Sequence, residues 1–131
     1  MDFSERFELY KEGGMITDAD IEDVKAVIDL FQKRYGVTLE EENAASFIAH
    51  LCAAYGRLTT KEKVDELPEE VVKELESLDT YELSKKILKE VMEVTHNPLN
   101  ETEQGYALLH INNLIAQFQA NGEWHTPAEI E

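Results

Sequence analysis

The stretch EENAASFIAHLCAAYGRL, from Glu41 to Leu58, predicts the helix around which the rest of the chain is arranged. Its apolar residues recur every three or four positions and therefore share one helix face: Ala44, Phe47, Leu51, Tyr55 and Leu58, with Ile48 widening it. His50 lies beside this face, about 100° from its centre at ~100° per residue. Asn43 and Arg57 stand seven residues before and after His50, on nearly the same stripe. The sequence thus predicts an amphipathic helix with a polar stripe along its edge.

A second stretch, ETEQGYALLHINNLIAQF from Glu101 to Phe118, repeats this arrangement. Its apolar face consists of Ala107, Ile111, Leu114 and Phe118. His110 flanks that face by a similar angle, and Glu103 and Gln117 lie seven residues on either side of it. Each of the two helices is therefore expected to present one histidine within a polar stripe.

The remaining periodic segments predict helices and no strands. A helix is expected over residues 18–35, opened by a Thr17–Asp20 capping box and ended at Gly36, and the pair Thr38 and Glu41 repeats the opening signal. A short helix is expected with Pro68 at its first position, and another is expected to be opened by Asp79 with Glu82. Residues 1–14 are compatible with either a short docking helix or a frayed end.

The fold class that follows is all-α, a compact five-helix bundle of antiparallel helix pairs. We expect an N-terminal arm over residues 1–15, the helical bundle over residues 16–120, and a C-terminal tail over residues 121–131. The last helix is expected to start near Asn100 or Glu101 and to end before Asn121 and Gly122.

Charge and cysteine content limit the classes of function. The net charge is −16, and the 12 Lys and Arg residues form no run, which argues against direct binding of DNA or RNA. Cys52 is the single cysteine, so no internal disulfide is expected, and its apolar surroundings predict a buried thiol in a reducing compartment. There is no signal-peptide pattern and no membrane-length apolar run. We therefore expect a cytoplasmic protein without membrane contact.

Three kinds of chemistry are open to the two histidines. They can be structural residues at the rim of the core, each hydrogen-bonded to a neighbour. They can be metal ligands, with His50, His110, Glu103 and His96 as the available set, although neither helix has the His-x-x-x-His or Glu-x-x-His spacing that places two ligands on one face. A neutral ring nitrogen can also accept a phosphoryl group from a donor protein, and Arg57 is one cation that could pair with the product. No Gly-rich phosphate loop or nucleophile elbow supports an enzyme.

The two histidine stretches resemble a known family. SFIAHLCAAYGRL is similar to the first histidine motif of the phosphotransferase-system regulation domain (PRD), and ETEQGYALLHIN is similar to the second. The 60-residue spacing between His50 and His110 also suits that domain. The resemblance extends over roughly residues 16 to 120, nearly the whole chain.

This resemblance implies a five-helix bundle that dimerises and is phosphorylated on histidine by the histidine phosphocarrier protein or by sugar-transporter components. On this basis His50 and His110 are the phosphoacceptors, and Arg57, Glu103 and Asn43 are supporting residues. Because the chain lacks the nucleic-acid-binding module usual in the family, a stand-alone PRD protein that acts through protein contacts in transcriptional regulation is expected. Leu109, which points away from the apolar face of its helix, favours a homodimer.

Two alternatives remain beside this interpretation. The first is a helical scaffold for dimerisation or interaction without phosphate chemistry. The second is a small metal-binding or ligand-binding bundle. None of the three is an enzyme, and the leading interpretation requires no cofactor or metal.

Overall fold

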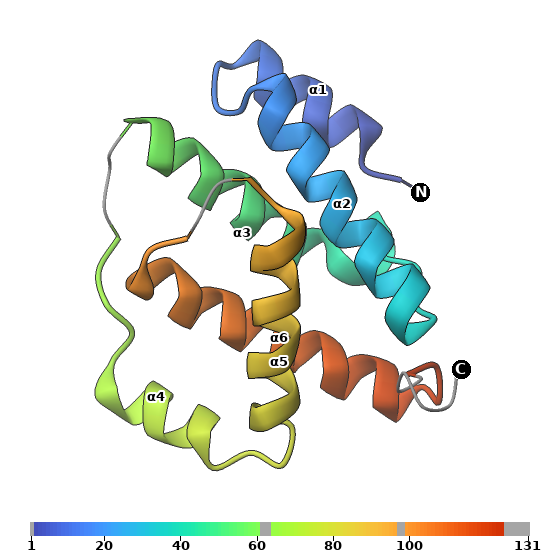
Figure 1. Ribbon diagram of the computed structural model, residues 1–131, viewed down its shortest axis with the longest axis vertical. Helices are drawn as coiled ribbons and strands as arrows, with labels where there is room; N and C mark the ends of the chain where they lie inside the picture. Colours follow the sequence, from blue (N-terminus) through green and yellow to red (C-terminus); the bar gives the residue numbers. More distant parts are fainter. Residues whose placement is uncertain (1, 61–63, 97–98, 125–131) are drawn as a thin grey trace.

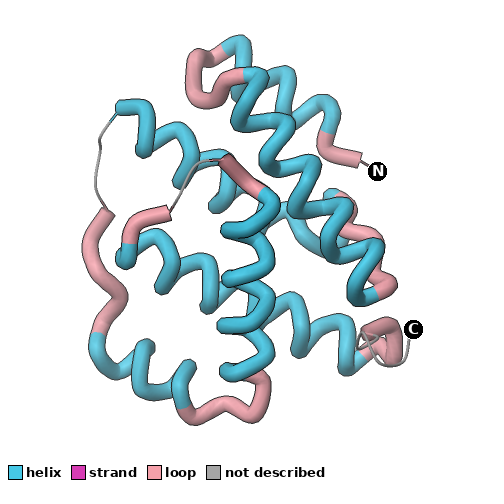
Figure 2. Tube along the Cα trace, in the orientation of Figure 1, coloured by secondary structure: helices cyan, strands magenta, loops and turns pink. Residues whose placement is uncertain are grey.

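Six α-helices make up the protein, and a computed structural model describes them over residues 2–60, 64–96 and 99–124 (Figure 1). Their bounds are α1 Ser4–Glu12, α2 Asp18–Tyr35, α3 Glu41–Thr60, α4 Glu69–Glu76, α5 Tyr81–Val94 and α6 Glu101–Ala120. Over those three ranges no residue forms a β-strand (Figure 2). The all-α class is confirmed, but the expected number of five helices is corrected to six.

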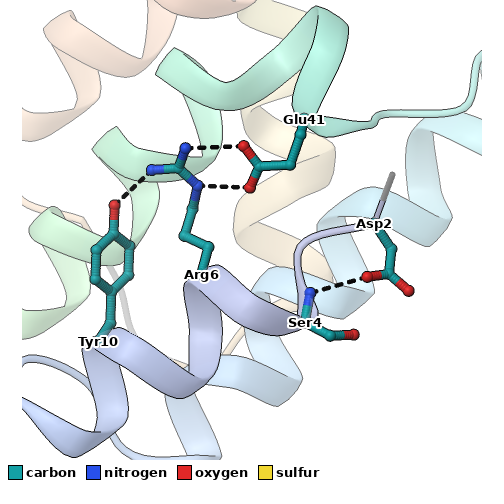
Figure 3. Close-up of polar contacts among 5 residues, drawn as sticks. All are labelled: Asp2, Ser4, Arg6, Tyr10 and Glu41. Atoms are coloured by element: carbon teal, nitrogen blue, oxygen red, sulfur yellow. Dashed lines mark hydrogen bonds and ion pairs between the residues drawn. The ribbon is translucent and has the colours of Figure 1, made fainter.

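The additional helix is α1, at the N-terminus. The phenyl rings of Phe3 and Phe7 are buried in the common core, at 2% and 6% exposure. The Arg6 guanidinium donates two hydrogen bonds to the Glu41 carboxylate, at 2.7 and 2.8 Å, and a third to the Tyr10 hydroxyl (Figure 3). Residues 4–12 are therefore a docked helix, because they bury two aromatic rings and pair one charge with α3.

The predicted ends of α2 are confirmed. Thr17 accepts a hydrogen bond from the Asp20 amide, and the Asp20 carboxylate accepts one from the Thr17 amide, which completes the capping box. Gly36 adopts a left-handed conformation with φ of 68° and ends the helix.

The predicted start of α3 is wrong in its detail. The Thr38 hydroxyl is hydrogen-bonded to the Gln32 side chain, and the Asn43 side chain instead accepts a hydrogen bond from the Glu40 amide at 2.8 Å. Ala44 leaves the helical conformation, with φ of −136° and ψ of 17°, so that α3 is kinked one turn after it begins. Local bonds of Asn43 therefore take the place of the expected capping box.

The shorter elements lie within a residue or two of their expected positions. Pro68 occupies the N-cap of α4. The expected opening of α5 by Asp79 with Glu82 is wrong, because Thr80 occupies its N-cap and makes no capping hydrogen bond from its side chain. Asn100 caps α6 by accepting from the Glu103 amide at 2.9 Å. After α6, Trp124 stacks on Tyr35 with ring centroids 4.7 Å apart, which brings the end of the described chain beside the end of α2 (Figure 1).

The core lies between α2, α3, α5 and α6, with α5 crossing α6 (Figure 1). Its largest fully buried apolar or aromatic side chains come from all four helices: Phe31 and Tyr35, Phe47, Ile48, Leu51 and Tyr55, Ile87, and Ile111, Ile115 and Phe118. The α3–α6 contact is one side of this core, and it places the two histidine stripes against each other. In the described part of the chain, no helix has the length and apolar character that crossing a bilayer requires.

Candidate functional site

The polar stripes of α3 and α6 meet in an antiparallel register. We call the six residues of these stripes the polar ladder, which pairs Asn43 with Gln117, His50 with His110, and Arg57 with Glu103. Successive members on each helix are seven residues apart, or about two turns, so each stripe stays on one side of its helix. This interface therefore brings together the two expected phosphoacceptors and the three expected supporting residues, Asn43, Arg57 and Glu103.

An ion pair holds one end of the ladder. The Arg57 guanidinium donates to both oxygens of Glu103, at 2.6 and 2.9 Å, and the Glu103 side chain is only 3% exposed. Glu103 lies in the first turn of α6 and Arg57 in the last turn of α3, so both helix dipoles favour these charges. Such a bidentate pair fixes the two helices in position and in rotation about their axes.

The imidazole rings of His50 and His110 form the middle of the ladder. Their centroids are 4.8 Å apart and their planes are inclined by 25°, so the rings are stacked. The Nε2 atom of His50 is buried without a hydrogen-bond partner. Burial, with a smaller effect from the neighbouring His110, lowers the pKa of His50 to about 4. Burial also lowers the pKa of His110. Both rings are therefore neutral near pH 7, with a nitrogen lone pair available on each.

The far end of the ladder is weaker and borders a groove. The Gln117 side chain donates to the backbone carbonyl of Asn43 at 3.3 Å. A groove of 390 Å³ opens here, between the kinked start of α3 and the middle of α6. Its lining includes His110, Phe47 and Leu114, and His50 is not part of it. The two histidines thus differ in their access to this groove.

Two contacts near the ladder were not foreseen from the sequence. The Tyr106 ring lies 6.1 Å from the His50 ring on the side of α6, and its hydroxyl donates to the Asp65 carbonyl at 2.7 Å. Tyr106 stands four residues before His110 and therefore on the same helix face, and this spacing was the sequence signal for the contact. The second contact is the Arg6–Glu41 pair (Figure 3), which nothing in the spacing of either residue indicated.

Other candidate residues lie elsewhere. The Nδ1 atom of His96 is 2.8 Å from the buried carboxylate of Asp23, so His96 does not join His50 and His110. Among the residues that the structure describes, no group of three or more His, Cys, Asp or Glu side chains is arranged to hold a metal ion. The Cys52 thiol is fully buried as predicted, and burial raises its pKa to about 12.

The arrangement defines a class of protein, a helical bundle with two neutral imidazoles at the contact of two helices, held in register by a buried ion pair. A family model described as the PRD domain matches residues 25–114, a range that contains α3, α4, α5 and most of α2 and α6. The chain belongs to the PRD domain family. Comparisons with curated proteins and with solved structures found no match.

Proposed function

We propose that this protein is a regulatory module of the phosphoenolpyruvate-dependent sugar phosphotransferase system, which accepts a phosphoryl group on the His50–His110 pair and acts through protein contacts in transcriptional regulation. The observation that carries the proposal is the stacked pair of neutral imidazoles, 4.8 Å apart, within the region matched by the PRD domain. The proposed donors are the histidine phosphocarrier protein and sugar-transporter components.

The electrostatics of the pair support acceptance of a phosphoryl group. An imidazole attacks phosphorus through a nitrogen lone pair, and the lowered pKa values of His50 and His110 keep that lone pair free at neutral pH. The nearby Arg57 is held by Glu103, so the site keeps a guanidinium within the same interface. To pair with a phosphoryl group, this guanidinium would give up part of its contact with Glu103.

A phosphoryl group at this position provides a route to a partner protein. It adds about −1.5 to −2 charges next to α3 and α6, the two helices that the ladder joins. Because the chain already carries a net charge of −16, the added charge increases the repulsion between this protein and any acidic surface that meets it nearby. We propose that this change alters a homodimer or the docking of a regulator.

To test this proposal, the protein is incubated with phosphoenolpyruvate, the general phosphotransferase enzyme and the phosphocarrier. Its intact mass is then measured under conditions that preserve acid-labile phosphate. We expect a phosphorylated wild type and an unphosphorylated double variant His50→Gln/His110→Gln. His96→Gln is the matched control, because the His96 side chain is 90% exposed and lies outside the ladder. A wild type that stays unmodified, with transporter components also supplied, contradicts the proposal.

A second candidate function is a helical interaction scaffold without phosphate chemistry. The buried Nε2 atom of His50 favours it, since a partly buried ring stacked on its neighbour can serve packing alone. This alternative predicts that the double variant keeps the same partner binding and the same oligomeric state. Light scattering of the wild type and of the double variant, with and without the phosphorylating system, separates the two functions.

A further inference from the structure

We infer that the two histidines are not equivalent, and that His110 accepts the phosphoryl group while His50 remains an unmodified positioning residue, so that each chain carries one phosphoryl group in the ladder. This inference rests on the proposed function and assigns the reacting residue within it. It depends on the position of each ring relative to the groove and to its neighbours.

Access separates the two rings. His110 borders the 390 Å³ groove, together with Asn113 and Gln117 on the same side of α6. A donor histidine must bring its phosphorus within bonding reach of the attacking nitrogen, and the groove is an open approach to His110. The ring of His50 does not border the groove; it neighbours the rings of Tyr106 and His110, at 6.1 and 4.8 Å, and although both histidines are partly exposed, the Nε2 atom of His50 is buried.

Position also separates them. Along the ladder, His50 lies between His110 and the Arg57–Glu103 ion pair, and its ring also faces Tyr106 of α6. Moving His50 outward would break its contact with Tyr106 as well as its stack on His110. These contacts suit a residue that positions the His110 ring by stacking against it.

Charge limits the site to one phosphoryl group. Each phosphohistidine carries about −1.5 to −2 charges, and the two rings are 4.8 Å apart in a partly buried interface. Two such groups would repel each other strongly at this separation. A second phosphorylation would therefore require α3 and α6 to separate, against the bidentate Arg57–Glu103 pair.

The step balances without a further reactant. The lone pair of a His110 ring nitrogen forms the new N–P bond, and the N–P bond of the donor phosphohistidine breaks, with its electron pair passing to the donor's ring nitrogen. The proton released from the second nitrogen of His110 equals the proton that the departing donor imidazole takes up. The chemical class of the donor is thus a protein phosphohistidine, or a small N-phosphoryl compound of comparable reactivity.

The first experiment uses phosphoramidate, a small phosphoryl donor for histidine, on the folded full chain, with peptide mapping of the chain's four histidines. We expect His110 to be labelled at least ~10-fold faster than His50, because His50 must wait for local opening. His96, with a 90% exposed side chain, reports the rate of an accessible ring. In concentrated urea, the difference between His50 and His110 should disappear. Equal labelling of both rings in the folded chain would overturn the inference.

The second experiment uses a phosphohistidine donor protein with the His110→Gln and His50→Gln variants, each checked for folding by circular dichroism. We expect His110→Gln to abolish labelling in the ladder and wild type to carry one phosphoryl group there, mapped to His110. Phosphate mapped to His50, or two groups in one ladder, overturns the inference and leaves the proposed function intact. Labelling of His110 by phosphoramidate alone, with no reaction from any donor protein, overturns the proposed function and leaves the difference between the rings standing.

Discussion

Single residues in this protein derive their chemistry from burial at the α3–α6 contact. His50 is an ordinary imidazole in the sequence, but in the fold it is partly buried beside His110 and Tyr106, next in the ladder to the Arg57–Glu103 pair. Burial disfavours its protonated form, whereas the Glu103 carboxylate favours that form, and burial dominates. Two residue-scale predictions follow from these contacts, one for the histidine and one for the ion pair.

Acidification should destabilise the fold through His50. Its pKa is about 4 in the folded state and ~6.5 when unfolded, so the unfolded chain binds more protons between these values. The stability contribution is therefore present above about pH 6.5 and is lost as the pH falls toward 4. Between about pH 7 and about pH 5 the wild type should lose about 2 kcal/mol more than His50→Gln does, as measured by urea unfolding. An equal loss in both proteins would contradict this pKa.

Removing one partner of the ion pair should be costly. Arg57→Ala leaves the Glu103 carboxylate buried without its guanidinium, and we expect a loss of about 3 kcal/mol in the free energy of unfolding. The double variant with Glu103→Ala should lose less than the two single variants together, because they share one interaction. Lys73→Ala is the control, since Lys73 and Glu69 form an ion pair whose side chains are 72% and 81% exposed. A loss no larger than that of Lys73→Ala would contradict the structural role of the pair.

At the scale of the elements, the helices are attached to one another through a few close contacts. The helix α1 contributes two aromatic rings to the core and is connected to the first turn of α3 through Arg6 and Glu41. In the last part of α3, Gly56 lies directly against the backbone at Met15, just before α2. These two contacts give predictions about packing that the helix propensities alone would not give.

The docking of α1 can be measured with a pair of substitutions in the same helix. Phe7 is 6% exposed, so Phe7→Ala should cost about 3 kcal/mol through lost burial and a residual cavity. Leu9 is 67% exposed, and Leu9→Ala should change stability by less than about 0.5 kcal/mol. Chemical unfolding of both variants tests this difference. Two similarly small effects would show that α1 is not part of the cooperative core.

Two glycines inside helices should respond to alanine with opposite signs. A Cβ at Gly56 would lie 2.5 Å from the Met15 carbonyl oxygen, so Gly56→Ala should destabilise the protein by forcing α3 and the segment before α2 apart. At Gly105 the nearest atom is the end of the Leu67 side chain at 3.4 Å, so Gly105→Ala should gain up to about 1 kcal/mol in helix propensity. Thermal unfolding of both variants gives the two signs. A stabilised Gly56→Ala would contradict the close approach.

For the whole molecule, the net charge of −16 is the dominant property. Like charges repel in the compact state and on the approach of a second acidic surface, and salt screens both effects. The exposed face of α4 alone carries Glu69, Glu70, Glu74 and Glu76. The stability of the chain and any self-association are thus expected to depend on ionic strength.

Added sodium chloride should therefore raise the free energy of unfolding. The change from low to physiological ionic strength is expected to be a gain of about 1 kcal/mol, because many weak repulsions are screened together. The variant Glu70→Gln/Glu74→Gln/Glu76→Gln, with substitutions on the exposed face of α4, should show a smaller salt dependence. Urea unfolding at several salt concentrations provides the measurement. A stability that falls with salt would mean that the ion pairs outweigh the net repulsion.

Much of the architecture was determined by the sequence alone. Local periodicity placed the apolar faces of α3 and α6, because a helix face depends only on spacing along the chain. The same spacing placed Asn43, His50 and Arg57 on one stripe, and it placed Glu103, His110 and Gln117 on another. The capping box at Thr17 and the end at Gly36 were also readable, since both are formed by neighbouring residues.

Only the tertiary structure decided how the two stripes meet. The antiparallel register that stacks His50 on His110 depends on how all the core side chains pack, a long-range property that no local pattern contains. The docking of α1 depends on the same packing, as does the burial that keeps both imidazoles neutral. The sequence therefore determined which residues belong to the site. The fold decided that one histidine borders a groove and that the other has a buried Nε2 atom away from it, because burial is set by the surrounding helices.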